Sequence, residues 1–368
     1  MSRPGIRIAI RADASARIGS GHVMRCLTLA DALRVAAADI LFVCRDLPGN
    51  LLHVVRAEGH RVAILPPVAG PQGDETLDWQ QDLRETIAVL QPHAPFDWIV
   101  VDHYHLDRRW ENAARSLGRR IMVIDDLADR PHDCDLLLDQ NYYRDLEERY
   151  RGLVPERCRL FLGPRFALLR KEFGQIKPRP RERRPVGRVL VFFGGADLTG
   201  ETEKVIRALK RTAFSGLAAD VIVGSSNPRI EAVRRLCETM PNVTLHVQTD
   251  RMAKLMSDAD LAIGAGGATT WERFRCELPA ITVVTAPNQQ ETTMDLAEAG
   301  AIWYLGRAEQ LDWPDYERAL RDALRQPGEL AEIARKAAAI MESQSADGGE
   351  DALSHLTRSI VEADSTVH

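Results

Sequence analysis

Short apolar runs alternate with longer amphipathic stretches through the first half of the chain. The runs have the length of strands and are bounded by turn residues, which is typical of a parallel sheet connected by crossover helices. They cover residues 6–10, 39–44, 61–65, 97–102, 120–125 and 134–139. Between the first two runs, apolar residues recur at helical spacing, at Val23, Leu27, Ala30 and Leu33. Further along the chain, Gly59 and Gly118 stand where helices are expected to end.

The alternation pauses across residues 163–187 and then resumes at 188–193, 220–224, 243–247, 259–264, 280–284 and 301–305, with helix expected from about residue 315 onward. This pattern predicts an α/β protein with two doubly wound, Rossmann-like domains. We place them at 1–163 and 188–345, joined by a linker at 164–187 and followed by a C-terminal helix and tail at 346–368. Doubly wound sheets bind ligands at the carboxyl ends of their strands, so two such domains facing each other would form a ligand-binding cleft.

The charge balance argues against two broad classes of partner. The 368 residues include 48 Lys and Arg against 53 Asp and Glu, a net charge of −5, which disfavours binding to nucleic acid or to a membrane surface. The basic run KPRPRERRP at 177–185 is interpreted as a solvated interdomain linker rather than a nucleic-acid arm.

Localisation and redox state follow from two further features. No window has the apolar length needed to span a bilayer, and the first ten residues lack the core of a secretory signal, so we expect the protein in the cytoplasm. The six cysteines are scattered without a CxxC pair, which argues against a zinc site and a disulfide framework. We expect them to be reduced and mostly buried.

The stretch GSGHVMRC at 19–26 places a histidine directly behind a tight glycine turn. His22 would lie in the first turn of a helix, where free N–H groups and the helix dipole favour a neutral imidazole over imidazolium. A neutral imidazole is what a general base requires. The same geometry would also suit a phosphate, with Gly19 and Gly21 letting it approach the backbone. A helix-capping turn with an incidental histidine is the third interpretation that this window allows.

A second glycine turn follows the run at 259–264, in GAGGATTWE. Gly266 and Gly267 precede Thr269 and Thr270, which are expected to open a helix that carries Glu272. Such a turn presents backbone N–H groups and hydroxyls to a pyrophosphate. A threonine stands where a dinucleotide fingerprint needs its last glycine, as Met24 does in the first window, so an NAD site is not predicted in either place.

Three more loops follow predicted strands. In APNQQ, Asn288 and Gln289 are expected to face the same crevice as the second glycine turn. In FFGGAD, Gly194 and Gly195 let the backbone approach the interdomain face closely. In VDHYHLD, a metal site built on Asp102, His103 and His105 is a weaker interpretation than a polar surface loop, but Tyr104 suits a sugar or phosphate.

Taken in order, RADAS, IGSGHVMRCLTLA, DHY, VIDDLADRPHDCDLLLDQN, FFGGAD and GAGGATTWE with APNQ resemble the nucleotide-sugar hydrolases of pseudaminic acid biosynthesis (the PseG family) along nearly the whole chain. The C-terminal block alone is also similar to the nucleotide-binding half of MurG-type glycosyltransferases. The resemblance implies a GT-B fold and metal-independent hydrolysis of UDP-2,4-diacetamido-2,4,6-trideoxy-β-L-altropyranose to UDP and the free sugar. It places the reaction in the synthesis of a nonulosonic acid used in flagellin glycosylation.

The resemblance also assigns roles. His22 matches the family's catalytic base, Tyr104 its substrate-binding tyrosine, Asn288 the asparagine of its NQ pair and Glu272 a residue suited to ribose hydroxyls. The remaining substrate-binding candidates are Arg11, Asp13, Gly19, Gly21 and Gln289, and the nucleotide-binding candidates are Gly194, Gly195, Gly266, Gly267, Thr269 and Thr270. The expected partner is a UDP-sugar, with no cofactor, metal, nucleic acid or membrane, and a monomer is compatible with the sequence.

Four other functions share these features. A glycosyltransferase would use the same fold and UDP site but carry the sugar to an acceptor. A hydrolase for an epimeric UDP-diacetamido sugar would differ by a few contacts. A non-catalytic nucleotide-sugar binding protein would show affinity without turnover. A UDP-sugar 2-epimerase of related fold would need further acid and base residues, which we do not identify.

Overall fold

The structure is a computed structural model that describes residues 5–67, 78–177, 185–211, 214, 216–342 and 352–362. The chain divides into two compact units. The first comprises residues 1–141, 145–170 and 345–368, and the second comprises 142–144 and 171–344. Most of the basic run predicted as a linker lies outside the described residues.

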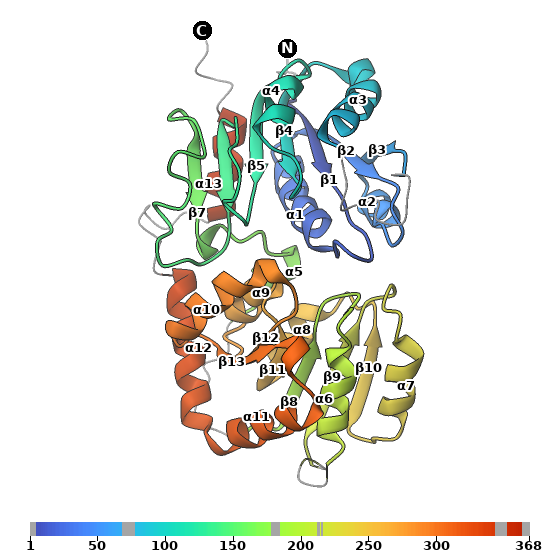
Figure 1. Cartoon of the computed structure of the whole chain (residues 1–368), viewed down its shortest axis with the longest axis vertical. Helices are drawn as coiled ribbons and strands as arrows, with labels where there is room; N and C mark the ends of the chain where they lie inside the picture. Colours follow the sequence, from blue (N-terminus) through green and yellow to red (C-terminus); the bar gives the residue numbers. More distant parts are fainter. Residues whose placement is uncertain are drawn as a thin grey trace. The chain divides into compact units, whose positions relative to one another are not determined.

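The first unit is a parallel sheet of seven strands in the order β3-β2-β1-β4-β5-β6-β7. Its strands are β1 (Arg7–Ala12), β2 (Asp39–Arg45), β3 (Arg61–Leu65), β4 (Phe96–Asp102), β5 (Gly118–Ile124), β6 (Leu136–Asp139) and β7 (Arg159–Leu162). Its α-helices are α1 (Gly21–Val35), α2 (Leu52–Ala57), α3 (Trp79–Leu90), α4 (Arg108–Ala114) and α13 (Ala352–Glu362). Figure 1 shows them around the sheet.

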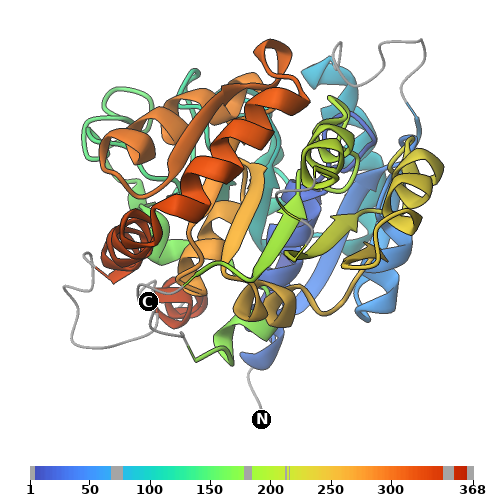
Figure 2. The same ribbon diagram turned by 90° about the horizontal axis from the view of Figure 1, so that it is seen from below.

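The second unit is a parallel sheet of six strands in the order β10-β9-β8-β11-β12-β13. The strands are β8 (Arg188–Phe192), β9 (Ala218–Val223), β10 (Val243–Val247), β11 (Leu261–Ala265), β12 (Ala280–Val284) and β13 (Trp303–Arg307). Its α-helices are α5 (Lys171–Gly174), α6 (Glu201–Leu209), α7 (Ile230–Glu238), α8 (Met252–Asp258), α9 (Thr269–Arg275), α10 (Gln290–Glu298), α11 (Trp313–Arg325) and α12 (Pro327–Glu342). In Figure 2, helices lie on both sides of these strands.

Both sheets bury apolar side chains against their helices. In the first unit, one cluster packs under α1 and α13 and includes Phe42 and Leu356, and another packs under α3 and α4 and includes Trp110. In the second unit, one large cluster packs under α6, α7 and α11. Further buried residues outside this cluster, such as Trp271, lie on α8, α9 and α12. The two doubly wound domains that the sequence predicts are thus confirmed, including the helices beyond residue 315.

Two features of the fold differ from the sequence prediction. Gly118 was expected to end a helix but begins β5, because α4 already ends at Ala114. A side chain at Gly118 would press on Ile99, with a Cβ only 2.7 Å from its Cγ1. The short strand β7 was missed, since it has only four residues and only Phe161 among them is buried.

The C-terminal helix α13 belongs to the first unit, although the second unit precedes it in the sequence. Leu356 and Ile360 join the core beneath α1, and the indole Nε1 of Trp98 in β4 donates a hydrogen bond of 3.0 Å to the carbonyl of Ile360. Within the described residues, no helix has the length and hydropathy needed to cross a bilayer. Five of the six cysteines are buried, as predicted.

Candidate active site

The loop between β1 and α1 presents a histidine at the start of a helix. Ser15 and Gly19 close this loop through a backbone hydrogen bond of 2.9 Å. Gly19 has a φ of +83°, a conformation that favours glycine. The helix begins at Gly21, so His22 is its second residue and lies in the first turn, as predicted. The imidazole is buried, with 5% of the residue exposed.

His22 forms a short contact with a buried carboxylate at the end of the neighbouring strand. Asp102 is the last residue of β4, and its Oδ1 lies 2.5 Å from Nδ1 of His22. An ionised carboxylate only accepts hydrogen bonds, so Nδ1 must carry the proton. In the neutral imidazole the lone pair then lies on Nε2. This arrangement gives His22 the tautomer of a general base that acts through Nε2.

Arg25 secures the carboxylate. Its Nε and one terminal nitrogen donate to the two oxygens of Asp102 at 2.7 and 2.6 Å. Burial alone would raise the pKa of Asp102, but Arg25 and then His22 hold it well below its ordinary value. Asp102 therefore stays ionised at neutral pH and accepts the hydrogen bond from Nδ1 of His22.

A second carboxylate connects Arg25 to the predicted substrate tyrosine. The other terminal nitrogen of Arg25 donates to both oxygens of Asp126 at 2.8 and 2.9 Å, and the hydroxyl of Tyr104 donates to Asp126 at 3.0 Å. The ring of Tyr104 meets the imidazole of His22 edge-on, with centroids 4.5 Å apart. The chain thus brings together His22 and Tyr104, two residues that the sequence singled out, by means of Arg25 and Asp126, which it did not.

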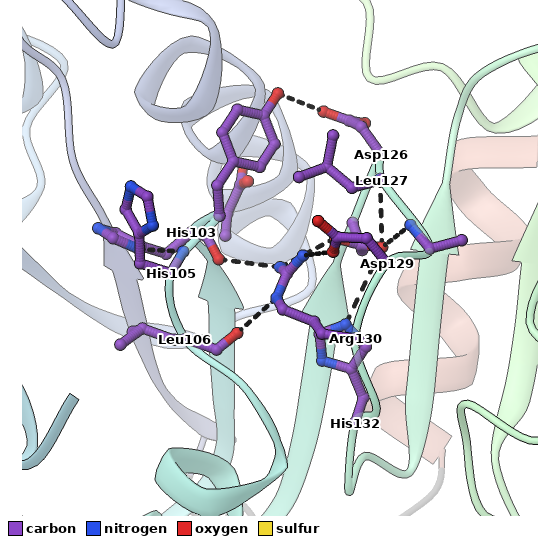
Figure 3. A network of polar contacts seen from close by, with 12 residues as sticks. His103, His105, Leu106, Asp126, Leu127, Asp129, Arg130 and His132 are labelled. Atoms are coloured by element: carbon purple, nitrogen blue, oxygen red, sulfur yellow. Dashed lines mark hydrogen bonds and ion pairs between the residues drawn. The ribbon is translucent and has the colours of Figure 1, made fainter. Parts of the chain in front are cut away.

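The segment that carries Tyr104 is not a surface loop throughout, which corrects the interpretation favoured from the sequence. Asp102 and His103 are buried, and only His105 is exposed. Arg130 fastens the segment by donating to the carbonyls of His103 and Leu106 at 3.1 and 2.9 Å (Figure 3). Among the described residues, no group of three or more His, Cys, Asp and Glu side chains is arranged to hold a metal ion.

Arg11 and Asp13 are almost completely buried and paired with each other. Two hydrogen bonds of 2.6 and 2.7 Å join them, and Arg11 also donates to Asp82 of α3 at 2.6 Å. Asp13 further accepts from the backbone N–H of Arg45 at 2.7 Å. Burial opposes ionisation of Asp13, but Arg11 keeps its pKa below the ordinary range. These contacts fasten the start of the β1–α1 loop to β2 and α3.

In the second unit, the glycine turn and the APNQ loop lie next to each other. The turn follows β11, and α9 begins at Thr269 and carries Thr270 and Glu272, as predicted. A Cβ on Gly267 would lie 3.5 Å from the amide nitrogen of Gln289. The amide oxygen of Gln289 accepts from the backbone N–H of Thr285 at 3.0 Å, and Asn288 is exposed.

Gly194 and Gly195 lie just beyond the end of β8 in the same unit. Gly194 has a φ of +91°. The carbonyl of Gly195 accepts a hydrogen bond of 2.9 Å from Gly224 after β9, and a Cβ on Gly224 would meet the backbone of Gly195 at 2.7 Å. This close approach explains the glycine at 224, whereas at 194 it is the positive φ that favours glycine.

The spacing of His22 and Arg25 in the sequence could have indicated that Arg25 belongs to the site. His22 and Arg25 are three positions apart and therefore share one face of a helix, beside the buried apolar residues Cys26 and Leu29. Two polar residues at such a position indicate a buried polar pairing. Nothing in the sequence alone indicates that their partner carboxylates would be Asp102 and Asp126.

Comparison with known proteins agrees with the predicted resemblance. Residues 189–348 match the glycosyltransferase family 28 C-terminal domain. The chain is 25% identical over 296 residues to the UDP-2,4-diacetamido-2,4,6-trideoxy-beta-L-altropyranose hydrolase of Campylobacter jejuni, which covers 80% of this chain and 97% of that protein. It is 26% identical to the spore coat polysaccharide biosynthesis protein SpsG of Bacillus subtilis, over 83% of this chain and 85% of that protein. The similarity to the hydrolase family expected from the motifs is confirmed at this level.

Solved structures support the fold. Acinetobacter baumannii MurG superimposes with a TM-score of 0.62 at 18% identity, over 97% of this chain and 99% of that one. Arabidopsis thaliana UGT89C1 complexed with UDP gives a TM-score of 0.64 at 13% identity, over 97% of this chain and all of that one. The predicted GT-B fold is therefore confirmed.

Proposed function

We propose that this chain is an enzyme that processes UDP-sugars and, more specifically, that it hydrolyses UDP-2,4-diacetamido-2,4,6-trideoxy-β-L-altropyranose to UDP and the free sugar with inversion at the anomeric carbon. The observation that carries the proposal is the pairing of His22 Nδ1 with Asp102 at 2.5 Å, in a chain that is similar to such a hydrolase over 80% of its length. This pairing leaves Nε2 of His22 as the base.

The chemical step needs one base and a good leaving group. A water molecule beside Nε2 of His22 attacks the anomeric carbon from the face opposite UDP. Its oxygen forms the new bond to that carbon while the bond to the phosphate oxygen breaks, and UDP leaves with the electron pair. The proton of the water passes to Nε2, and Asp102 stabilises the resulting imidazolium through Nδ1–H. UDP needs no general acid when its developing charge is stabilised by hydrogen-bond donors.

The proposed substrate-binding residues belong to both units. Tyr104, Gly19 and Gly21 of the first unit, together with Asn288 and Gln289 of the second, are proposed to bind the sugar. Arg11 and Asp13 are proposed to shape the β1–α1 loop from behind, because each is buried and paired with the other. The proposed nucleotide-binding residues belong to the second unit: Gly194, Gly195, Gly266, Gly267, Thr269, Thr270 and Glu272.

The decisive experiment follows the anomeric proton signal by NMR. The purified protein is mixed with UDP-2,4-diacetamido-2,4,6-trideoxy-β-L-altrose in the presence of EDTA, and spectra are recorded from the first turnover. We expect prompt release of the free sugar in the opposite anomeric configuration. Retention of configuration would contradict direct attack by water, and an unchanged substrate signal would contradict the assigned substrate.

Substitution of His22 tests its role. His22→Leu should lower turnover by roughly two to four orders of magnitude, the range for loss of a general base, while the affinity for UDP stays nearly unchanged. His53→Leu is the matched control, because His53 is an exposed histidine of α2 in the same unit. If His22→Leu abolished UDP binding instead, His22 would be a phosphate ligand, and the mechanism would be wrong.

A glycosyltransferase is the second candidate. The match of residues 189–348 to a glycosyltransferase domain and the likeness to MurG favour it. Such an enzyme would transfer the sugar to an acceptor hydroxyl in place of water. Incubation with a panel of candidate acceptors separates the two functions, since a coupled product at the expense of the free sugar would identify the transferase.

A further inference from the structure

Arg273 is a buried cation next to the glycine turn of the second unit, and it has no carboxylate partner within the part of the chain that the structure describes. It lies on α9 and is 2% exposed. One terminal nitrogen donates to the carbonyl of Ala265 at 3.0 Å and to Oγ1 of Thr270 at 2.8 Å. Its Nε is buried and has no hydrogen-bond partner among the residues that the structure describes.

Arg273 differs from the other buried arginines, which are paired with carboxylates. Arg11, Arg25 and Arg45 each form ion pairs with aspartates at 2.6–2.8 Å. Arg273 forms no ion pair with any described residue, and only its neighbour Glu272 offsets the effect of burial on its charge. Burial lowers the pKa of Arg273 to about 10, so the guanidinium is still protonated at neutral pH. An unpaired charge in this position is unfavourable unless a ligand balances it.

The contacts of Arg273 determine what the turn offers to a ligand. The hydroxyl oxygen of Thr270 accepts from Arg273, so the hydroxyl proton of Thr270 is left to donate elsewhere. The guanidinium also lies close to the backbone at the end of β11, where a Cβ on Gly264 would be 2.9 Å from a terminal nitrogen of Arg273. The turn therefore combines a nearby positive charge, a hydroxyl with a proton to donate and, at Gly267, a backbone without a side chain of its own. Each of these features favours an anion.

We infer that Arg273 is a positioning residue for the nucleotide: it supplies the buried counter-charge to the diphosphate at the Gly264–Thr270 turn and orients the hydroxyl of Thr270 toward it. This inference rests on the proposed assignment of the nucleotide to that turn. Arg273 acts through Thr270 and through its charge, which is poorly screened in the interior. The terminal phosphate carries the additional negative charge that distinguishes UDP from UMP, so the effect should be larger for UDP.

Calorimetric titration of the full chain with UDP and with UMP tests this. Arg273→Met keeps an unbranched side chain of similar length but removes the charge. We expect it to raise the Kd for UDP about tenfold or more, and the Kd for UMP by clearly less, as for loss of a charge and a charge-assisted hydrogen bond. Its Tm without ligand should be equal to or higher than that of the wild type, because an unpaired buried charge is removed.

The controls separate the charge from a general effect on the helix. Arg275→Met removes the same charge from the same helix at a position without ion pairs to described residues, and should leave both affinities within about twofold. If Arg273→Met fails to fold, Arg273→Gln provides a second neutral variant that retains an N–H donor. We expect the same selective loss of UDP affinity in that variant.

Two results would overturn the inference. An unchanged Kd for UDP in a folded neutral variant would show that the charge of Arg273 does not serve the nucleotide. Equal losses for UDP and UMP would show that Arg273 only maintains the shape of the turn. A wild-type protein that does not bind UDP at all would contradict the proposed nucleotide site itself, an outcome that the first titration reveals before any variant is made.

Discussion

Nδ1 of His22 lies 2.5 Å from Oδ1 of Asp102, although 80 positions separate the two residues in the sequence. The contact exists because β1 pairs with β4 in parallel register, with Ala12 opposite Asp102. The loop that leaves β1 then returns as α1 above the end of β4. A parallel sheet thereby supplies the partner that fixes the tautomer of a helix-terminal histidine.

The first prediction concerns this pair. Asp102→Asn should lower turnover by roughly two to four orders of magnitude, because an amide no longer fixes the imidazole tautomer or stabilises the imidazolium. Steady-state kinetics gives turnover, and calorimetry gives the affinity for UDP, which should change little. Asp31→Asn is the matched control, since Asp31 contacts Nε2 of His60 at 3.1 Å in the same unit. Equal activity losses in the two variants would contradict a specific role for Asp102.

The second prediction concerns Tyr104. Burial, followed by the charge of Asp126, raises the pKa of Tyr104 well above its ordinary value, so the hydroxyl stays protonated throughout the working pH range. Tyr104→Phe removes one hydrogen bond to Asp126 and should reduce kcat/KM about tenfold. The alkaline limb of the pH–rate profile should keep its position in the variant. A shift of that limb would identify Tyr104 as a titrating catalytic group and contradict the expectation.

The sequence predicts the fold and the glycine turns well, because each depends on local pattern. Strands of a buried parallel sheet form continuous apolar runs, and the turn before His22 needs a left-handed residue at Gly19, so both features are visible in a single window. Thr269 at the start of α9 is predicted for the same reason.

Features that depend on packing between distant segments are not predicted. The link from Arg25 to Asp126 spans 101 positions and requires the ends of α1 and β5 to meet. Arg11 and Asp13 follow the expected end of β1, but only the structure shows that Arg11 pairs with both Asp13 and Asp82. The attachment of α13 to the first unit likewise depends on a core that no local pattern reveals.

The third prediction concerns stability against pH. Burial, followed by the charge of Asp126, raises the pKa of Asp139 to about 8. Between the ordinary carboxyl pKa near 4 and about 8, the folded state therefore holds a proton that the unfolded state has lost. This group makes the free energy of unfolding decrease as the pH rises through that window, by at most about 1.4 kcal/mol per pH unit. Asp139→Asn removes the dependence because the amide does not titrate.

Urea unfolding at pH 5.5 and pH 8 measures this effect. The free energy of unfolding of Asp139→Asn, relative to wild type, should be clearly higher at pH 8 than at pH 5.5. Asp145→Asn makes the same change of charge at an exposed position and should show little pH-dependent difference. A constant difference between Asp139→Asn and wild type at both pH values would show that Asp139 is already ionised at pH 5.5.

The last prediction compares two adjacent glycines of the turn after β11. A Cβ on Gly266 would collide with Oγ1 of Thr293 in α10, whereas the nearest atom to a Cβ on Gly267 is 3.5 Å away, an ordinary contact. Gly266→Ala should therefore destabilise the protein by about 1–3 kcal/mol through overpacking and weaken UDP binding, and Gly267→Ala should cost much less stability. Thermal unfolding and calorimetric titration with UDP measure both effects.

A double substitution tests the cause. Oγ1 of Thr293 has no hydrogen-bond partner among the described residues, so Thr293→Ala removes the colliding atom without breaking a hydrogen bond. Added to Gly266→Ala, it should restore much of the lost stability, a coupling that separate sites would not show. If the two changes were simply additive, the sensitivity of Gly266 would have to come from its backbone conformation rather than from the space that Thr293 occupies.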